Sequence, residues 1–262
     1  MQVARCEWVP TLRDALGLLK VQVPRMPSKK TYIAIGLTSS VFLLLVYLLM
    51  KSILPGEQDV LCLGDSYTIG ESVEEKHRWP NQLVAQLQDR GGQWNQPRII
   101  AKTGWTTDEL QSAISQNPFI GHTYGWVTLL IGVNNQYRGR DAEVFREDFR
   151  ELLQYAIERA SNRPSRVLVL SIPDWGVTPF AQSRDTKKIA FEIDAFNRIK
   201  REETLAQHAH FIDITDISRE APEEPSKWLA PDELHPSGAM YQRWAQRAAD
   251  VVLQEIKKAA EL

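Results

Sequence analysis

The chain is poor in cysteine and carries almost no net charge, and each absence excludes a class of protein. Only Cys6 and Cys62 are present among its 262 residues, which excludes a disulfide framework and a cysteine-based zinc cluster. The 31 basic and 33 acidic residues give a formal net charge of -2 at pH 7. Because a nucleic-acid-binding domain is usually strongly basic, we expect no nucleic-acid partner.

Several motifs are also missing from the sequence. It has no glycine-rich phosphate-binding loop and no HExxH zinc motif. The G-x-S-x-G elbow of the α/β-hydrolases is absent as well, since residues 64–68 read Gly-Asp-Ser-Tyr-Thr. The sequence therefore predicts neither a metal nor a cofactor.

One long hydrophobic run lies near the N-terminus. Residues 31–50 contain no charged side chain, and about 20 such residues suffice to cross the hydrocarbon core of a bilayer. Arg25, Lys29 and Lys30 precede the run, whereas only Lys51 follows it closely. The positive-inside rule then places the N-terminus in the cytoplasm. We therefore expect one transmembrane helix that anchors an extracytoplasmic domain, either periplasmic or extracellular.

A cleaved signal peptide, and hence a secreted protein, is the alternative for this run. Against cleavage, no small-x-small site follows Met50. The expected organisation is a cytoplasmic segment over 1–30, a membrane segment over 31–50, a linker over 51–58 and one globular domain over 59–262. A methionine at position 26, followed by Pro-Ser-Lys-Lys, leaves open whether residues 1–25 are translated.

Beyond the linker, apolar strand-like runs alternate with amphipathic helix-like segments. The expected strands are 60–63, 98–101, 126–131, 166–172 and 210–214. The expected helices are 79–89, 107–115, 142–160, 186–207 and 239–262. Such strict alternation predicts a five-stranded parallel sheet covered by helices on both faces, that is, a three-layer α/β/α sandwich.

The edge of this sheet selects the candidate reactive residues, because ligands of open parallel sheets bind at the carboxyl ends of the strands. Ser66 follows the first strand, and His235 lies between the fifth strand and the last helix. Asp232, three residues before His235, is placed to orient its imidazole as in a catalytic triad. Taken singly, Ser66 is also compatible with a turn or capping residue, and Asp232 and His235 with a chance pairing in a loop.

Four short blocks, each after an expected strand, resemble those of the SGNH (GDSL-type) hydrolase family over the whole soluble part. They are the Gly64-Asp65-Ser66 triplet, Gly104 in AKTGWTT, Asn134 in LIGVNNQ, and Asp232 with His235 in DELHP. The resemblance implies a flavodoxin-like sheet with Ser66 as nucleophile, His235 as base and Asp232 as orienting carboxylate. It also implies an oxyanion hole made by Ser66, Gly104 and Asn134.

Two positions depart from the family pattern. Tyr67 stands where the name of the motif has leucine, and we expect its side chain to pack rather than react. Asn135 replaces the aspartate that often follows the asparagine of the third block. Alignment of the G-x-N residues selects Asn134, rather than Asn135, for the oxyanion.

Three tryptophans, Trp105, Trp175 and Trp228, lie in loops after the second, fourth and fifth strands. A single tryptophan in such a loop usually packs against the core. Three at one edge of the sheet predict an apolar wall for substrate.

The resemblance implies a serine hydrolase that cleaves carboxylic esters through an acyl-enzyme on Ser66. A lysophospholipid, a short acyl ester or an acetylated glycan would be its substrate. Two alternatives remain at this stage: a catalytically silent binding domain on a membrane anchor, and a thioesterase.

Overall fold

The computed structural model describes residues 56–116 and 122–261, which belong to the unit that begins at Ile53. The expected segments 1–30 and 31–50 and most of the linker lie outside the described residues. Over 56–116 and 122–261, none of the helices is long and apolar enough to cross a membrane.

The core of the domain is one sheet of five parallel strands. Its spatial order is β2-β1-β3-β4-β5, the flavodoxin-like order, so the predicted fold class and strand arrangement are confirmed. Every residue of β1, β3 and β4 is buried, as expected of strands covered on both faces. The strands are β1 (Val60–Gly64), β2 (Arg98–Ala101), β3 (Trp126–Leu130), β4 (Val167–Leu170) and β5 (His210–Ile212).

Three strands end earlier than their apolar runs predict. β3 stops before Ile131 and β4 stops before Ile172, although both residues are fully buried. The reason is that side-chain groups, rather than a neighbouring strand, bond the backbone at these positions. The carbonyl of Ile131 accepts a hydrogen bond from Lys200, and both backbone groups of Ile172 bond the side-chain amide of Asn197. β5 likewise ends at Ile212, because the N–H of Ile214 bonds a serine hydroxyl instead.

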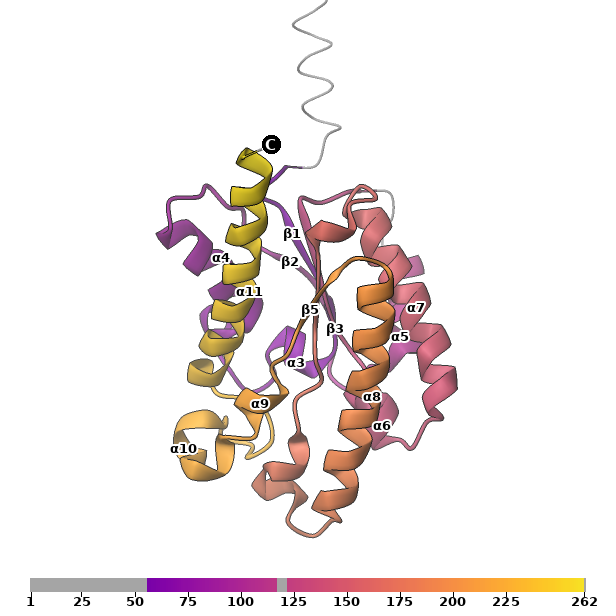
Figure 1. The fold of residues 1–262 in the computed structure, drawn as a ribbon. Helices are drawn as coiled ribbons and strands as arrows, with labels where there is room; N and C mark the ends of the chain where they lie inside the picture. The colour runs from indigo at the N-terminus through magenta and orange to yellow at the C-terminus, as the bar shows by residue number, and fades with distance from the viewer. Residues whose placement is uncertain (1–55, 117–121, 262) are drawn as a thin grey trace, which may run out of the picture. The chain divides into compact units, whose positions relative to one another are not determined.

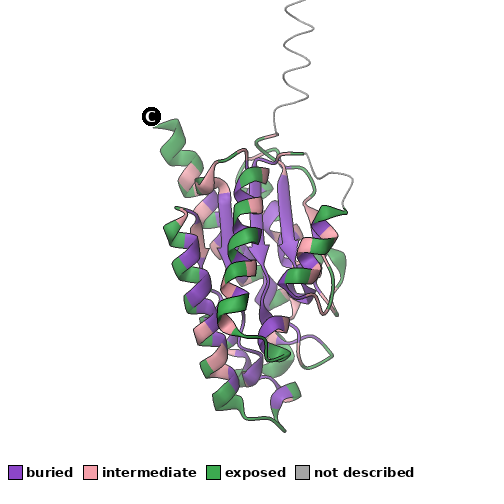
Figure 2. Ribbon diagram, turned by 90° about the vertical axis from the view of Figure 1, so that its right-hand side faces the viewer, coloured by how far each residue is buried: buried purple, intermediate pink, exposed green. Residues whose placement is uncertain are grey.

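Helices cover the two faces of the sheet (Figure 1). One face carries α4 (Trp79–Asp89) and α11 (Gly238–Ala260), which pack against each other. The other face carries α5 (Thr107–Ser115), α7 (Ala142–Arg159) and α8 (Thr186–Ala206). Figure 2 shows the buried strands in the interior and the exposed helix faces outside. The predicted three-layer sandwich is therefore confirmed.

Short helices lie at the carboxyl edge of the sheet, at the bottom of Figure 1. They are α3 (Ser66–Ile69), α6 (Val133–Tyr137), α9 (Thr215–Ser218) and α10 (Pro225–Trp228). All follow strands directly or through a loop. The carboxyl edge of the sheet is therefore formed by turns and short helices, whose backbone N–H and C=O groups can take part in a site.

Local sequence signals account for where the longer helices begin. Thr106 and Glu109 form a capping box at the start of α5. Asp141 caps α7 by accepting the N–H groups of Glu143 and Val144. The apolar positions of α7 then recur at helical spacing and are buried toward the sheet, as its stripe of phenylalanines and leucines predicts.

Candidate active site

Ser66 occupies the turn that leads out of β1. The carboxylate of Asp65 caps α3 by accepting the N–H of Tyr67 at 3.1 Å. A side chain at Gly64 would clash with the Thr68 hydroxyl and the Leu130 carbonyl, so only glycine allows this close approach. Ser66 is consequently held at the carboxyl edge of the sheet, only 5% exposed.

The loop before α11 holds His235 against Asp232. Nδ1 of His235 lies 2.7 Å from Oδ2 of Asp232. The other carboxylate oxygen, Oδ1, accepts the N–H groups of Leu234 at 3.1 Å and His235 at 2.9 Å. The carboxylate therefore fixes the turn and the imidazole together, and it selects the tautomer that leaves Nε2 free to accept a proton.

A second hydroxyl supports this carboxylate. Oγ of Ser72 donates to Oδ2 of Asp232 at 2.5 Å. Burial raises the pKa of Asp232, but the hydrogen bonds from Ser72 and His235 outweigh burial and lower the pKa to about 2. Asp232 therefore remains ionised at neutral pH and can stabilise a charged His235.

Sequence reasoning missed Ser72, since it lies 160 residues from Asp232 along the chain. Its backbone φ of 62° falls in the left-handed region, which serine rarely adopts. Ser72 and Asp232 belong to loops that only the folded sheet brings together. The one local signal is the position of Ser72 shortly after α3.

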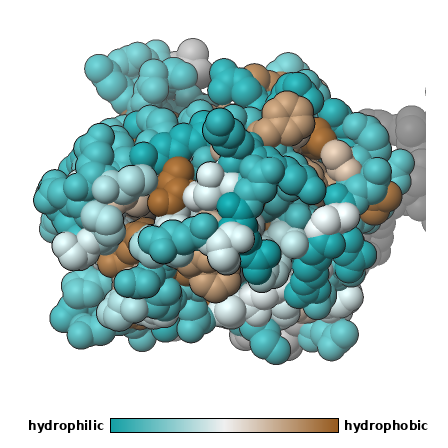
Figure 3. Space-filling model, turned by 90° about the horizontal axis from the view of Figure 1, so that it is seen from below, coloured by the Kyte–Doolittle hydropathy of each residue, from teal (hydrophilic) through white to brown (hydrophobic). Residues whose placement is uncertain are grey.

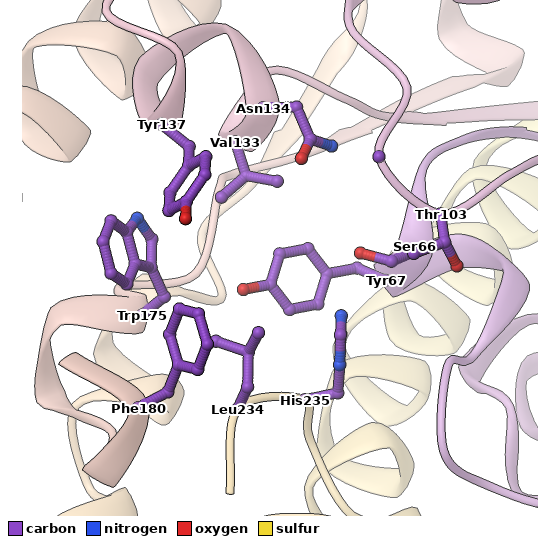
Figure 4. A pocket seen from close by; sticks show the side chains of 11 residues that line it. Ser66, Tyr67, Thr103, Val133, Asn134, Tyr137, Trp175, Phe180, Leu234 and His235 are labelled. Carbon is purple, nitrogen blue, oxygen red and sulfur yellow. The ribbon is translucent and has the colours of Figure 1, made fainter. Parts of the chain in front are cut away.

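Asn134 and His235 lie on opposite sides of Ser66 (Figure 4), and Gly104 lines the same pocket. The φ of Gly104 is +88°, a value that favours glycine, while its surroundings leave room for a Cβ. Nη2 of Arg138 donates to the Gly104 carbonyl at 2.6 Å. Nδ2 of Asn134 donates to the Trp105 carbonyl at 2.9 Å, and this bond uses one of its two hydrogens.

The two neighbouring asparagines have separate environments. Asn134 lines the pocket beside Ser66. Asn135 is 2% exposed, and its side-chain amide bonds both the N–H and the hydroxyl of Thr107 at the start of α5. The geometry therefore assigns Asn135 to holding α5 and leaves Asn134 as the amide that faces the site.

One pocket of about 230 Å³ joins these groups. Ser66, Gly104, Asn134 and His235 all line it, and a ring nitrogen of His235 is directed at Ser66 (Figure 4). The rest of its lining is largely apolar: Tyr67, Thr103, Val133, Tyr137, Trp175, Phe180 and Leu234. The arrangement brings together a hydroxyl, an imidazole with its carboxylate, and an amide donor.

Of the three tryptophans expected to form the wall, the lining includes Trp175. Trp105 and Trp228 are not among the residues that line this pocket. Trp105 packs against the core and contributes its backbone carbonyl to Asn134. The Trp228 ring lies under the side chains of Lys227 and Arg243, 4.3 and 5.3 Å from its centre.

The aromatic wall is fixed by polar contacts behind it. Nε1 of Trp175 donates to Gln136 at 2.8 Å. Nη2 of Arg184 donates to the hydroxyl of Tyr137 at 2.9 Å, and its guanidinium lies 5.9 Å or less from the rings of Tyr137, Trp175 and Phe180. Seen from the carboxyl edge, the largely hydrophilic surface is interrupted by apolar patches (Figure 3). Tyr137 and Phe180 thus reach solvent at the rim, 45% and 44% exposed.

A buried lysine lies next to the site. Lys200 of α8 is fully buried, and its Nζ donates to the carbonyls of Ile131 at 2.9 Å and Leu170 at 2.7 Å. Burial lowers the pKa of Lys200 and raises the pKa of Asp65, while the attraction between the two groups opposes both shifts. No sequence signal indicates Lys200, because lysine on a surface helix normally faces water.

Within residues 56–116 and 122–261, no group of three or more histidine, cysteine, aspartate or glutamate side chains could hold a metal ion. Of the five histidines, only His235 lines the pocket beside Ser66; the others are His77, His122, His208 and His210.

Several solved structures share this fold over most of the domain. TesA has a TM-score of 0.58 at 16% identity, covering 74% of this chain and 98% of its own. A member of the lipolytic G-D-S-L family from Veillonella parvula has a TM-score of 0.56 at 19% identity, covering 74% and 97%. Axe2, an acetyl xylan esterase from Geobacillus stearothermophilus, has a TM-score of 0.54 at 16% identity, covering 76% and 96%. At these identities the likeness shows the fold.

Sequence comparison identifies the family. No curated protein matches the chain, but residues 62–243 match the GDSL-like Lipase/Acylhydrolase family. This match spans more than half of the chain and includes Ser66, Gly104, Asn134, Asp232 and His235. The chain therefore belongs to the GDSL-like lipase/acylhydrolase family and is an SGNH-type ester hydrolase.

Proposed function

We propose that the protein hydrolyses carboxylic esters through an acyl-enzyme formed on Ser66. The observation that carries this proposal is the 2.7 Å contact between Nδ1 of His235 and Oδ2 of Asp232, in a pocket that Ser66 also lines. A carboxylate, an imidazole and a hydroxyl in this order form a proton-transfer chain. A binding domain would have no need of it.

Acylation begins with transfer of the Ser66 proton to Nε2 of His235, while Oγ of Ser66 attacks the ester carbonyl. Asp232, with its low pKa, stabilises the imidazolium that results. The tetrahedral intermediate then collapses, the bond to the alcohol oxygen breaks, and His235 returns the proton to the departing alcohol. A water molecule then attacks the acyl carbon while His235 takes its proton. The bond from that carbon to Oγ of Ser66 breaks, His235 returns the proton to Oγ, and the acid is released.

Three donors are available for the oxyanion of each tetrahedral intermediate. They are the N–H groups of Ser66 and Gly104 and the second hydrogen of Nδ2 of Asn134. The N–H of Ser66 opens α3 and has no acceptor within that helix. Arg138 holds the loop at Gly104, and Trp105 holds the amide of Asn134. Donors fixed in this way need no reorganisation when charge develops.

The solved structures of similar fold suggest candidate classes of ester substrate. Axe2 is an acetyl xylan esterase, which supports an acylated glycan as one candidate. A lysophospholipid and a short acyl ester remain the others. A thioester would use the same residues, because the serine, imidazole and oxyanion donors act on its carbonyl carbon in the same way.

Labelling of the full-length protein with a fluorophosphonate probe tests the nucleophile. We expect one covalent adduct on Ser66, no adduct in the Ser66→Ala variant, and a matching loss of p-nitrophenyl ester hydrolysis. Mass spectrometry of the labelled peptide locates the adduct. If the wild-type protein takes no label and hydrolyses neither esters nor thioesters, the result would instead favour a catalytically silent binding domain.

The neighbouring asparagines allow a matched test of the oxyanion hole. Asn134→Ala is expected to lower kcat by about 10²–10³ with an unchanged melting temperature, because it removes one oxyanion donor. Asn135→Ala is expected to destabilise the fold by about 1–3 kcal/mol, since it leaves groups of Thr107 unpaired. Kinetics and thermal unfolding of both variants check these outcomes. A reversed pattern would assign the oxyanion to Asn135.

Ser72 is expected to act as a positioning residue. Ser72→Gly removes the hydroxyl while suiting the left-handed backbone, and we expect kcat to fall by up to about 10-fold with KM unchanged, because a hydrogen bond to a charged group is lost. Ser161, with a φ of 59°, provides the control, and Ser161→Gly should leave kcat unchanged. Equal kcat in the two variants would refute the role of Ser72.

We also propose that residues 31–50 anchor the protein in a membrane with residues 56–262 outside the cytoplasm. Their uncharged length and the basic residues before them support this. We expect the full-length protein to sediment with membranes after a carbonate wash, and a chain lacking residues 1–55 to remain soluble. A shortened protein in the medium or periplasm would support signal cleavage instead. A full-length protein in the cytosolic fraction would contradict both.

A further inference from the structure

Tyr67 occupies the position between the nucleophile and the apolar end of the pocket. Its side chain is 3% exposed, and its ring contacts those of His235 and Trp244 edge-on, with centroids 5.6 and 6.0 Å away. In Figure 4 the ring extends from the Ser66 side of the pocket toward Trp175 and its apolar neighbours. These two ring contacts hold Tyr67 in place.

The hydroxyl of Tyr67 lies at the far end of this ring. It points toward the apolar lining formed by Val133, Trp175, Phe180 and Leu234 (Figure 4). The hydrogen bonds within residues 56–116 and 122–261 include none to this hydroxyl. Burial, reinforced by the carboxylates of Asp65, Asp174 and Asp232, raises the pKa of Tyr67, so it stays a neutral hydroxyl. A neutral polar group therefore faces an otherwise apolar space.

The pocket that the Tyr67 ring enters is small as a whole. The cavity of about 230 Å³ falls below the roughly 300–1,000 Å³ of pockets that enclose a drug-sized ligand. Its far wall is held by the bond from Trp175 to Gln136 and by the bond from Arg184 to Tyr137. These two bonds fix the side chains of Trp175 and Tyr137 in the wall.

We propose that Tyr67 restricts the acyl group of the substrate to short chains, from acetyl to about butyryl. The inference rests on the proposed attack by Ser66, because it assumes that the acyl group enters this pocket. A short acyl group fits beside the Tyr67 ring. A long alkyl chain would have to cover the hydroxyl and deprive it of any hydrogen-bond partner, which disfavours binding on the order of 10-fold or more.

Leucine is the residue that the family motif has at this position, and it makes the test direct. Tyr67→Leu shortens the side chain and removes the hydroxyl, which opens the pocket toward Trp175. Tyr67→Phe keeps the ring and removes only the hydroxyl. The two variants therefore separate the effect of volume from the effect of polarity.

The experiment measures kcat/KM for p-nitrophenyl esters of two to ten carbons with the full-length protein and its variants. For the wild type we expect kcat/KM to fall by about 10-fold or more between the four-carbon and eight-carbon esters. An unobstructed apolar pocket would instead gain about fourfold for each buried methylene. Tyr67→Leu should raise the ratio of eight-carbon to two-carbon activity by about 10-fold or more, and Tyr67→Phe by less.

The ratio of kcat/KM for the eight-carbon ester to kcat/KM for the two-carbon ester distinguishes a change in specificity from damage to the catalytic residues. A displaced His235 would slow all esters alike and leave the ratio unchanged. Tyr155→Leu is the matched control: Tyr155 lies on α7 with Arg159 5.0 Å over its ring, outside the pocket lining, and its ratio should equal that of the wild type.

Two outcomes would overturn the role of Tyr67 while leaving the proposed function intact. One is a wild type that hydrolyses the eight-carbon ester as well as the four-carbon ester. The other is a pair of folded, active Tyr67 variants with the wild-type ratio. A wild type that hydrolyses no ester and takes no label on Ser66 would overturn the proposed function, and this inference with it.

Discussion

The parallel sheet imposes the constraint on which the rest of the domain depends. Because all five strands run the same way, every carboxyl end meets at one edge, and every connection must cross a face. β1 lies between β2 and β3. The turns that carry Ser66, Gly104 and Asn134 are therefore neighbours at the point where the strand order reverses, although the chain separates them by tens of residues.

Helix α8 completes this edge by holding the ends of β3 and β4. Lys200 bonds the carbonyls of Ile131 and Leu170, and one turn earlier Asn197 bonds both backbone groups of Ile172. Without these side chains, buried carbonyls would lose their partners where the ladder stops. The turn that carries Asn134 begins just after Ile131, so a buried lysine that does not itself line the pocket helps to define where that amide lies.

Sequence patterns predicted the sheet, the five long helices and the order of the four family blocks, because these depend on local periodicity and on the rule for parallel strands. Contacts between distant loops were not predictable in the same way. Ser72 has no pattern that links it to Asp232, and Lys200 resembles any exposed helical lysine. The wall was predicted from three tryptophans, of which the pocket lining includes Trp175. A tryptophan after a strand can pack inward as readily as line a pocket, and only the folded loops decide which.

Two carboxylates near Ser66, Asp65 and Asp232, show why residue type alone does not assign a role. Asp232 accepts hydrogen bonds from Ser72, Leu234 and His235, and its pKa falls to about 2. Asp65 directly precedes Ser66, yet burial raises its pKa, and in the described part of the chain its Oδ2 has no hydrogen-bond partner. Asp232 therefore carries a negative charge beside the imidazole of His235, which accepts a proton during the reaction. Beside the nucleophile, where an oxyanion must form, the environment disfavours negative charge on Asp65. The opposite shifts in pKa separate the carboxylate that supports proton transfer from the one that caps a helix.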